Sequence, residues 1–174
     1  NEWHEATEVA PSFEYGRHFV DMTAEGIRLW KAADFSAVPY VWLDFGRQPY
    51  VQGLRPSLRD HDGSWRVRGL INREAAYPDH NSHPPSSYIY LDVGNDFLFG
   101  AAREVWLTVE YFDKGTDAWY VEYDGTAGPY TKTGKVKLTD SRKWKRKTLR
   151  LRDAFFGGRQ NHGADLRIGD DFAV

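Results

Sequence analysis

The sequence predicts an all-β fold, an antiparallel β-sandwich, and three observations carry this prediction. Aromatic residues make up 16% of the 174 residues, including seven Trp and ten Tyr, and aromatic side chains favour strands. The chain also contains 16 Gly and eight Pro, the residues that favour turns. Apolar and polar residues alternate over many short runs, which is the period of a strand with one buried face. These runs lie at the spacing expected of a sandwich.

The first half of the chain contains the less regular runs. We predict strands there at Ile27–Ala32, Val38–Leu43, Tyr50–Leu54 and Trp65–Ile71.

Alternation is clearest in the second half. Ser87–Val93 is one predicted strand, and Arg103–Phe112 and Ala118–Asp124 are two more, joined by the glycine-containing turn Asp113–Thr116. Two alternating runs with a short turn between them predict an antiparallel hairpin. Further strands are expected at Lys135–Thr139, Lys147–Asp153 and Gly163–Gly169, with one short helical turn at Asp153–Phe156.

The length predicts one domain over residues 1–174, with residues 1–21 as an extended N-terminal segment. A net charge of −2 argues against a duplex nucleic acid bound by bulk charge and gives no reason to expect a membrane surface. No apolar run is long enough to span a bilayer. Cysteine is absent, which excludes disulfides, thiol catalysis and zinc–thiolate sites.

Aromatic and charged side chains alternate with the apolar ones on the predicted strands. If Val105, Leu107 and Val109 point inward, Trp106 points outward. Apolar sugar faces stack on aromatic rings, and sugar hydroxyls bind carboxylates and guanidinium groups. The candidate glycan-binding residues of this outward surface are Tyr88, Tyr90, Trp106, Glu110, Tyr120, Glu122, Arg150 and Arg167. Alternatively, Glu2–Asp21 covers these aromatics and buries them as a second small core.

Two further sets of residues are weaker candidates. The proline-rich loop Ala75–Ser87 offers Tyr77, His80 and His83 as polar glycan contacts, although the pattern favours a surface turn without a role. A structural calcium site would use carboxylates near the two ends of the chain, for which Asp21, Glu25 and Asp165 are the candidates.

Two long motifs resemble a known family. The run VEYFDKGTDAWYVEYDG and the tail WKRKTLRLRDAFFGGRQNHGADLRIG are similar to galactose-binding-domain-like jelly rolls. These domains occur as carbohydrate-binding modules beside glycoside hydrolases and polysaccharide lyases. The resemblance covers about Ser86 to Ile168 and implies two antiparallel sheets, structural calcium, and glycan binding on the concave face or at loop tips.

The predicted function is therefore a non-catalytic carbohydrate-binding module, secreted or at the cell surface. Its expected partners are a polysaccharide and a catalytic domain in the same parent chain, with no nucleic acid and no membrane. A small jelly-roll lyase or hydrolase is the alternative, because Glu110 and Glu122 would face the same way on neighbouring strands. The E-x-D-x-x-E motif of jelly-roll endoglucanases and the R-x-E-L-R motif of jelly-roll lyases are absent, and so is a G-x-S-x-G nucleophile elbow. A purely structural accessory sandwich is the third possibility.

Overall fold

The computed structural model divides the chain into two compact units, Asn1–Val38 and Pro39–Val174. It describes residues 20–21, 23–24, 40–46, 50–57, 61–71, 73–83 and 85–171. The four described residues of the first unit are helical. The strand expected at Ile27–Ala32, and the segment 1–21 apart from Val20 and Asp21, lie outside the described residues. In the part of the chain that is described, no helix has the length and hydrophobicity needed to cross a membrane.

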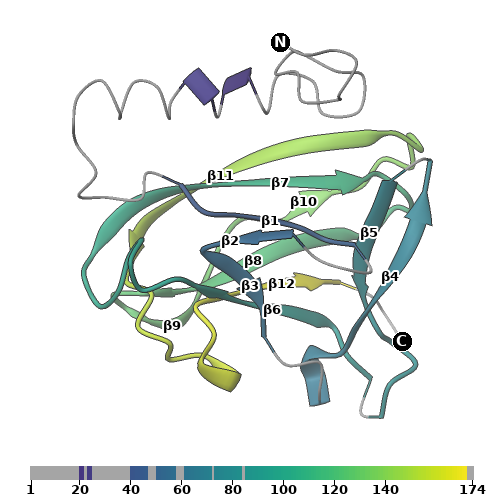
Figure 1. Ribbon diagram of the computed structural model, residues 1–174. Helices are drawn as coiled ribbons and strands as arrows, with labels where there is room; N and C mark the ends of the chain where they lie inside the picture. Colours follow the sequence, from purple (N-terminus) through teal and green to yellow (C-terminus); the bar gives the residue numbers. More distant parts are fainter. Residues whose placement is uncertain are drawn as a thin grey trace. The chain divides into compact units, whose positions relative to one another are not determined.

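The second unit is all-β and antiparallel, as predicted (Figure 1). Its strands are β1 (Trp42–Asp44), β2 (Tyr50–Gln52), β3 (Leu54–Pro56), β4 (Trp65–Leu70), β5 (Arg73–Pro78), β6 (Tyr88–Val93), β7 (Arg103–Phe112), β8 (Ala118–Gly125), β9 (Gly128–Lys132), β10 (Val136–Lys137), β11 (Trp144–Ala154) and β12 (Leu166–Asp170). Two 3₁₀ turns, η2 (His61–Gly63) and η3 (Asn161–Gly163), interrupt the loops.

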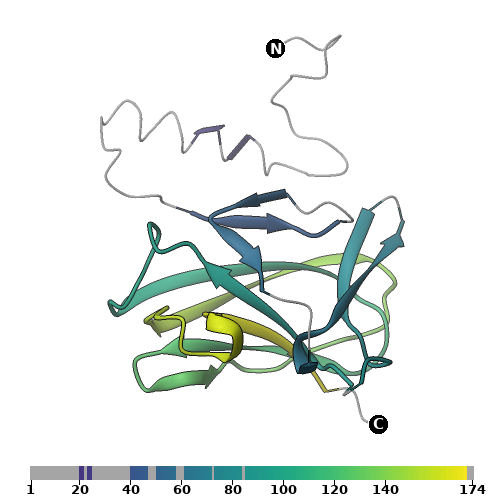
Figure 2. The same ribbon diagram turned by 60° about the horizontal axis from the view of Figure 1, so that its bottom comes forward.

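The main sheet is ordered β3-β6-β12-β8-β11-β7, and β9 and β10 also pair with β8. Strands β8 and β11 share a single pair, Ala154 with Gly125, so the sheet bends at this point. Strands β3, β6, β12 and β8 form one layer, and the long β7–β11 pair forms the other (Figures 1 and 2). Strand pairs β1–β2 and β4–β5 form two small sheets of their own.

The hydrophobic core lies between these two layers. Strands β6, β8 and β12 contribute Ile89, Leu91, Val93, Trp119, Val121, Tyr123 and Leu166, and β11 contributes Leu151. From β7, Val105, Leu107 and Val109 pack against this cluster, whereas Trp106 is exposed. The predicted register of the Arg103–Phe112 strand is therefore correct.

The predicted hairpin between Arg103–Phe112 and Ala118–Asp124 is wrong. Strand β7 pairs with β11 over Arg103–Phe112, and β8 pairs with β12, β9 and β10. The turn after β7 therefore carries the chain from one layer to the other instead of reversing it within a sheet. A short glycine-containing turn is compatible with both connections, and only the partners of each strand distinguish them.

Several element boundaries also differ from the predictions. The structure adds β5 within the expected loop Ala75–Ser87 and adds β9, while the strand at Lys135–Thr139 shortens to β10. No helical turn forms at Asp153–Phe156, because β11 continues to Ala154 and Phe156 adopts a positive φ of 47°. Alanine, glycine and proline dilute the alternating pattern of β5 and β9, so neither strand has a strong sequence signal.

Three buried aspartates tie the loops to the strands. Asp113 accepts hydrogen bonds from the backbone and hydroxyl groups of Thr139 and Ser141, and its carboxylate lies 2.7 Å from the ammonium group of Lys145. Asp124 accepts bonds from the Gly157 amide and the Arg159 side chain. Asp165 accepts the amides of Val93 and Gly158 in the same way. Each carboxylate thus satisfies loop donors that no strand partner reaches.

We predict that truncating the core on β11 will strongly destabilise the fold. Leu151 is fully buried between the layers, whereas its neighbour Arg152 is exposed. Leu151→Ala should lower the free energy of unfolding by about 2–5 kcal/mol. Arg152→Ala should change it by no more than about 0.5 kcal/mol. Urea denaturation measures both values, and equal effects would contradict the assigned register.

We also predict an acid-dependent contribution from Asp113. Lys145, followed by Ser141, holds the pKa of the Asp113 carboxyl far below its usual value. A lowered folded-state pKa means that the stabilisation is present above the unfolded pKa of about 3.9 and is lost as the pH falls below it. The melting temperature of Asp113→Asn should therefore lie well below that of the wild type at pH 7, and the gap should narrow below about pH 4. Asp96→Asn, at an exposed position, is the matched control; a gap that stays constant with pH would contradict the prediction.

Candidate functional site

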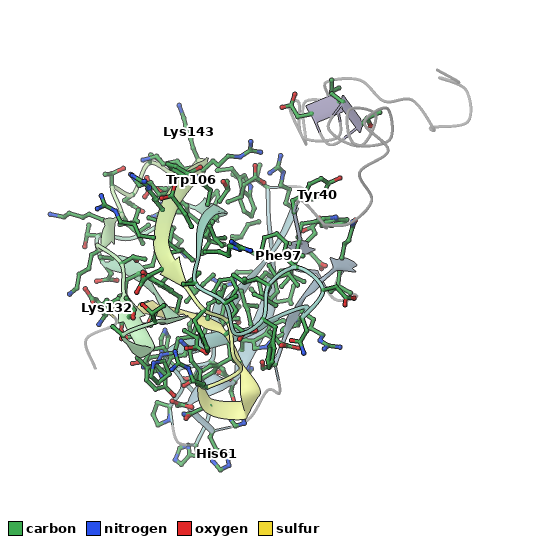
Figure 3. All side chains as sticks on the ribbon, turned by 90° about the vertical axis from the view of Figure 1, so that its left-hand side faces the viewer. Tyr40, His61, Phe97, Trp106, Lys132 and Lys143 are labelled. Atoms are coloured by element: carbon green, nitrogen blue, oxygen red, sulfur yellow. The ribbon has the colours of Figure 1, made fainter. Side chains whose placement is uncertain are left out.

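The eight predicted glycan-binding residues lie on two different outer faces. Tyr88, Tyr90, Tyr120, Glu122 and Arg167 lie on the β6–β12–β8 layer, and Trp106, Glu110 and Arg150 lie on the β7–β11 layer. Because the two layers pack through their inner faces, their outer faces point in opposite directions. In Figure 3, Trp106 accordingly lies at the opposite end of the molecule from His61, which belongs to the loops beside Tyr90.

This separation corrects two predicted arrangements. Trp106 does not share one outward surface with Tyr90 and Tyr120, because β7 pairs with β11 and not with β6 or β8. Glu110 and Glu122 likewise do not face the same way on neighbouring strands.

A row of polar side chains crosses the outer face of the first layer. Strand register places Arg167 of β12 opposite both Tyr90 of β6 and Glu122 of β8. The Arg167 guanidinium donates to the Glu122 carboxylate at 2.5 Å and to the Tyr90 hydroxyl at 2.6 Å. Lys132 of β9 lies 3.4 Å from the other Glu122 oxygen. The row therefore links four strands through charge-assisted contacts.

Aromatic rings enclose the same guanidinium. The Arg167 guanidinium carbon lies 3.7 Å from the centroid of the Tyr88 ring and 4.4 Å from that of Tyr130, distances at which a cation is attracted to the ring face. Tyr88 and Tyr120 meet over Gly169, where a Cβ atom would lie 2.9 Å from ring carbons of both. Only glycine leaves room for the two rings at this position.

Two loops cover the row. The Tyr90 hydroxyl donates to Asp62 at 3.0 Å and accepts from Asn161 at 3.2 Å, and these residues belong to η2 and to η3. Tyr90 is only 1% exposed. Tyr90 and Tyr120 are therefore buried and Tyr88 is half-buried, and these two loops contribute to the cover. The burial expected for all the outward aromatics does not extend to Trp106, which is exposed. The segment Glu2–Asp21, predicted to cover them, lies outside the described residues apart from Val20 and Asp21.

The charged and polar groups of the row compensate one another. Burial raises the pKa of Tyr90 to about 12, although its hydrogen bond from Arg167 acts in the opposite direction. Burial alone would lower the pKa of Arg167, but the bonds to Glu122 and Tyr90 outweigh it and raise the pKa above its usual value. Both groups therefore keep fixed charge states near neutral pH. We interpret this row as a structural element.

The β7–β11 face is open. Trp106 is 62% exposed, and the Arg150 guanidinium lies 5.6 Å from its ring centroid while donating to Glu104 at 2.5 Å. Beside it, the Thr108 and Thr148 hydroxyls lie 2.9 Å apart. A large exposed ring among groups that donate and accept hydrogen bonds is able to stack a sugar and bind its hydroxyls.

Glu110 extends this face along β7. Its carboxylate contacts Arg146 at 2.6 Å and Arg73 at 3.2 Å. The sequence interpretation did not include Glu104, Arg146 or Arg73 among the site residues. The outward position of Arg146 in the predicted strand was the available signal, whereas the contact of Arg73 depends on the β4–β5 pair.

The loop that carries the weaker glycan candidates is organised around Asp79, which was not among the predicted site residues. Asp79 is buried, accepts from Arg66 at 2.7 Å and caps the Asn81 amide at 3.2 Å. His80 lies 3.1 Å from Asp170, Tyr77 lies on β5, and His83 is exposed. These three side chains therefore do not share one set of contacts, and their role in glycan binding stays a prediction.

The predicted calcium ligands are not brought together among the residues that the structure describes. Asp21 is exposed, Glu25 lies outside the described residues, and both oxygens of Asp165 accept backbone amides. Burial raises the pKa of Asp165, and these amide bonds oppose the effect. In the described ranges, no three His, Asp or Glu side chains gather as metal ligands. A calcium site stays a prediction.

Comparison with known proteins does not assign this chain to a family. No protein-family model, curated protein or solved structure matches this chain significantly. The functional argument therefore depends on the geometry alone.

We predict that Gly169 is required for the packing of the outer aromatic rings. Gly169→Ala should lower the free energy of unfolding by about 1–3 kcal/mol, as overpacking does. Gly69→Ala is the matched control, because Gly69 also lies in a strand but has open space around the position of a Cβ atom. It should be neutral or slightly stabilising. Urea denaturation of both variants tests this, and similar losses in the two would contradict the packing described.

Proposed function

We propose that this chain is a non-catalytic carbohydrate-binding module that binds polysaccharide through the outer face of β7 and β11. The single observation that supports it best is the exposed indole of Trp106 on a regular strand pair. An aromatic platform needs both exposure and rigidity, and a ten-residue strand paired along most of its length supplies the rigidity.

The neighbours of Trp106 supply the polar half of such a site. Arg150 and Glu104 form one pair beside the ring, and Thr108 and Thr148 form another. Ion pairs between exposed side chains contribute little to stability. Their groups are therefore available to exchange water for sugar hydroxyls at small cost. The other predicted face lacks this property, because Tyr90, Tyr120 and Glu122 are buried.

The same geometry favours binding over catalysis. A glycosidase requires two carboxylates on either side of one bond, and Glu110 and Glu122 belong to different layers. A lyase of the Tyr/His kind requires an accessible tyrosine, and the Tyr90 hydroxyl is occupied by Arg167, Asp62 and Asn161. Neither set of residues is therefore arranged for catalysis.

The proposal includes the finer fold and the setting of the protein. We infer a jelly-roll domain of the galactose-binding-like kind, secreted or at the cell surface. It would be attached to a carbohydrate-active enzyme in the same parent chain. Its contribution would be to hold that enzyme near the polysaccharide and so raise its effective concentration.

The experiment is affinity gel electrophoresis of the full chain in a panel of polysaccharides. Trp106→Ala should bind about thirtyfold more weakly than the wild type, since loss of a central aromatic anchor costs ~2 kcal/mol. Its melting temperature should hardly change, because the ring is exposed. Phe99→Ala is the matched control, since Phe99 is 56% exposed but lies outside β7 and β11. It should bind like the wild type.

Other outcomes identify the alternatives. New reducing ends or unsaturated products in the panel would show an enzyme instead of a binding module. Absence of retention in every polysaccharide would leave the structural accessory domain as the explanation. Equal losses for Trp106→Ala and Phe99→Ala would move the site away from this face.

A further inference from the structure

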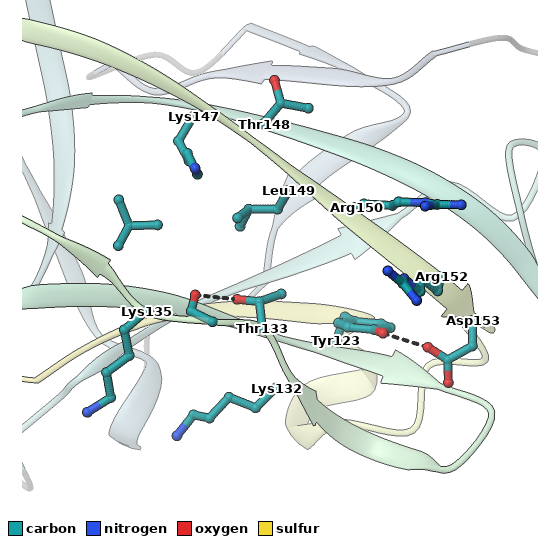
Figure 4. A pocket seen from close by; sticks show the side chains of 12 residues that line it. Tyr123, Lys132, Thr133, Lys135, Lys147, Thr148, Leu149, Arg150, Arg152 and Asp153 are labelled. Atoms are coloured by element: carbon teal, nitrogen blue, oxygen red, sulfur yellow. Dashed lines mark hydrogen bonds between the residues drawn. The ribbon is translucent and has the colours of Figure 1, made fainter.

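A cationic groove lies along the side of the molecule, where β9 and β10 face β11. Its volume is about 660 Å³, and it is lined by Tyr123, Lys132, Thr133, Gly134, Lys135, Val136, Lys147, Thr148, Leu149, Arg150, Arg152 and Asp153. In Figure 4, Lys132 and Lys135 lie on one side of it, and Arg150 and Arg152 lie on β11. A volume of this size is typical of small-ligand sites.

The side chains that line this groove are mainly positively charged. Five of the lining residues are Lys or Arg, and Asp153 is the one carboxylate among them. The Asp153 carboxylate accepts the hydroxyls of Tyr123 at 2.5 Å and Thr126 at 3.0 Å. The whole chain has a net charge of −2. Positive charge is therefore concentrated in the groove, and the composition of the whole chain does not account for it.

Two of the five cations form no ion pair in the part of the chain that the structure describes, although the charge of Arg152 acts on the nearby Glu104 carboxylate. Lys135 pairs with Asp171, Lys132 with Glu122, and Arg150 with Glu104, and none of these partners lines the groove. Within the described residues, Lys147 and Arg152 form no ion pair, and both are exposed. An anion in the groove would supply the missing partner for these two cations.

The groove also offers apolar and backbone contacts. Val136 and Leu149 border it and pack against the core, and Tyr123 belongs to the core itself. Strand β11 pairs with β7 along one edge and meets β8 only at Ala154. The Asp153 carbonyl accepts the Thr126 amide, and within the described residues the rest of that second edge has no strand pairing. An extended chain with polar and apolar sides matches this surface.

The groove adjoins the Trp106 face. Thr148 and Arg150 line the groove, and the same two side chains contact Thr108 and the Trp106 ring. A ligand that stacks on Trp106 thus reaches the groove over the edge of β11. A nucleic acid fits less well, because binding by phosphate charge needs a larger basic surface than five residues in a chain of net charge −2.

We propose that the glycan of the proposed function is an anionic polysaccharide, whose carboxylate or sulfate groups bind in the groove while a sugar ring stacks on Trp106. Arginine guanidinium groups donate two parallel hydrogen bonds to such acid groups, and lysines add point charges. This inference rests on the proposed function, because it names the ligand class of the same extended site.

The test compares polygalacturonate and dextran sulfate with neutral dextran and a neutral galactan, by affinity electrophoresis at two salt concentrations. The double variant Lys147→Gln/Arg152→Gln should bind the anionic polymer about tenfold more weakly, which corresponds to loss of about one charge-assisted hydrogen bond. Lys114→Gln/Lys143→Gln is the matched control: it removes the same charge from two exposed residues that do not line the groove. The difference in affinity for the anionic polymer between the wild type and the groove double variant should shrink at high salt. Retention by only polygalacturonate or only dextran sulfate would identify the acid group.

The outcomes separate this inference from the proposed function. Equal retention in neutral and anionic polymers, with the groove variant unchanged, would overturn the inference and leave glycan binding by Trp106 in place. No retention in any polymer would overturn both. Retention of oligo(dT) as strong as that of the anionic glycans, with Trp106→Ala unaffected, would show a general polyanion site and overturn the inference. Retention that needs both Trp106 and the two groove cations supports both proposals.

Discussion

The position of Arg167 on the outer face of β12 is the constraint on which the arrangement of the first layer depends. Strand β12 lies between β6 and β8, and Arg167 meets Tyr90 on one side and Glu122 on the other. A slip of one residue would turn Arg167 into the core and Leu166 out of it. A buried ion pair adds little net stability because both charges lose their hydration. We infer that its contribution is the register of the central strand.

The buried aspartates have a comparable effect on the loops. Asp113, Asp124 and Asp165 are each almost fully buried and accept amides or side-chain donors from segments outside the strands. A loop amide that lost its acceptor on burial would cost about 1–3 kcal/mol. The carboxylates therefore allow the chain to cross between the two layers and to close over Tyr90 without leaving donors unsatisfied.

Because of these constraints, the polar groups of one face are already paired with one another, whereas those of the other surfaces are open to a ligand. The face with Arg167 is satisfied by its own residues and covered, so its polar groups are occupied before any ligand arrives. The opposite face keeps Trp106 in solvent, and the side groove contains Lys147 and Arg152, which form no ion pair among the described residues. Binding capacity remains where polar and aromatic groups are not already used for folding. For this reason the proposals concern β7, β11 and the adjacent groove.

The sequence by itself determined the class of fold and the face of each long strand. Alternation placed Leu107 inward and Trp106 outward, because side chains of a strand point to opposite sides with a period of two. It did not determine which strands are neighbours, so it paired β7 with β8 and merged two opposite faces into one predicted site. The strand pairings in the structure join residues far apart in the chain, such as Arg150 with Trp106 and Arg167 with Tyr90. Only the tertiary structure decided them, because local periodicity carries no information about the partner across a sheet or about the layer to which a strand belongs.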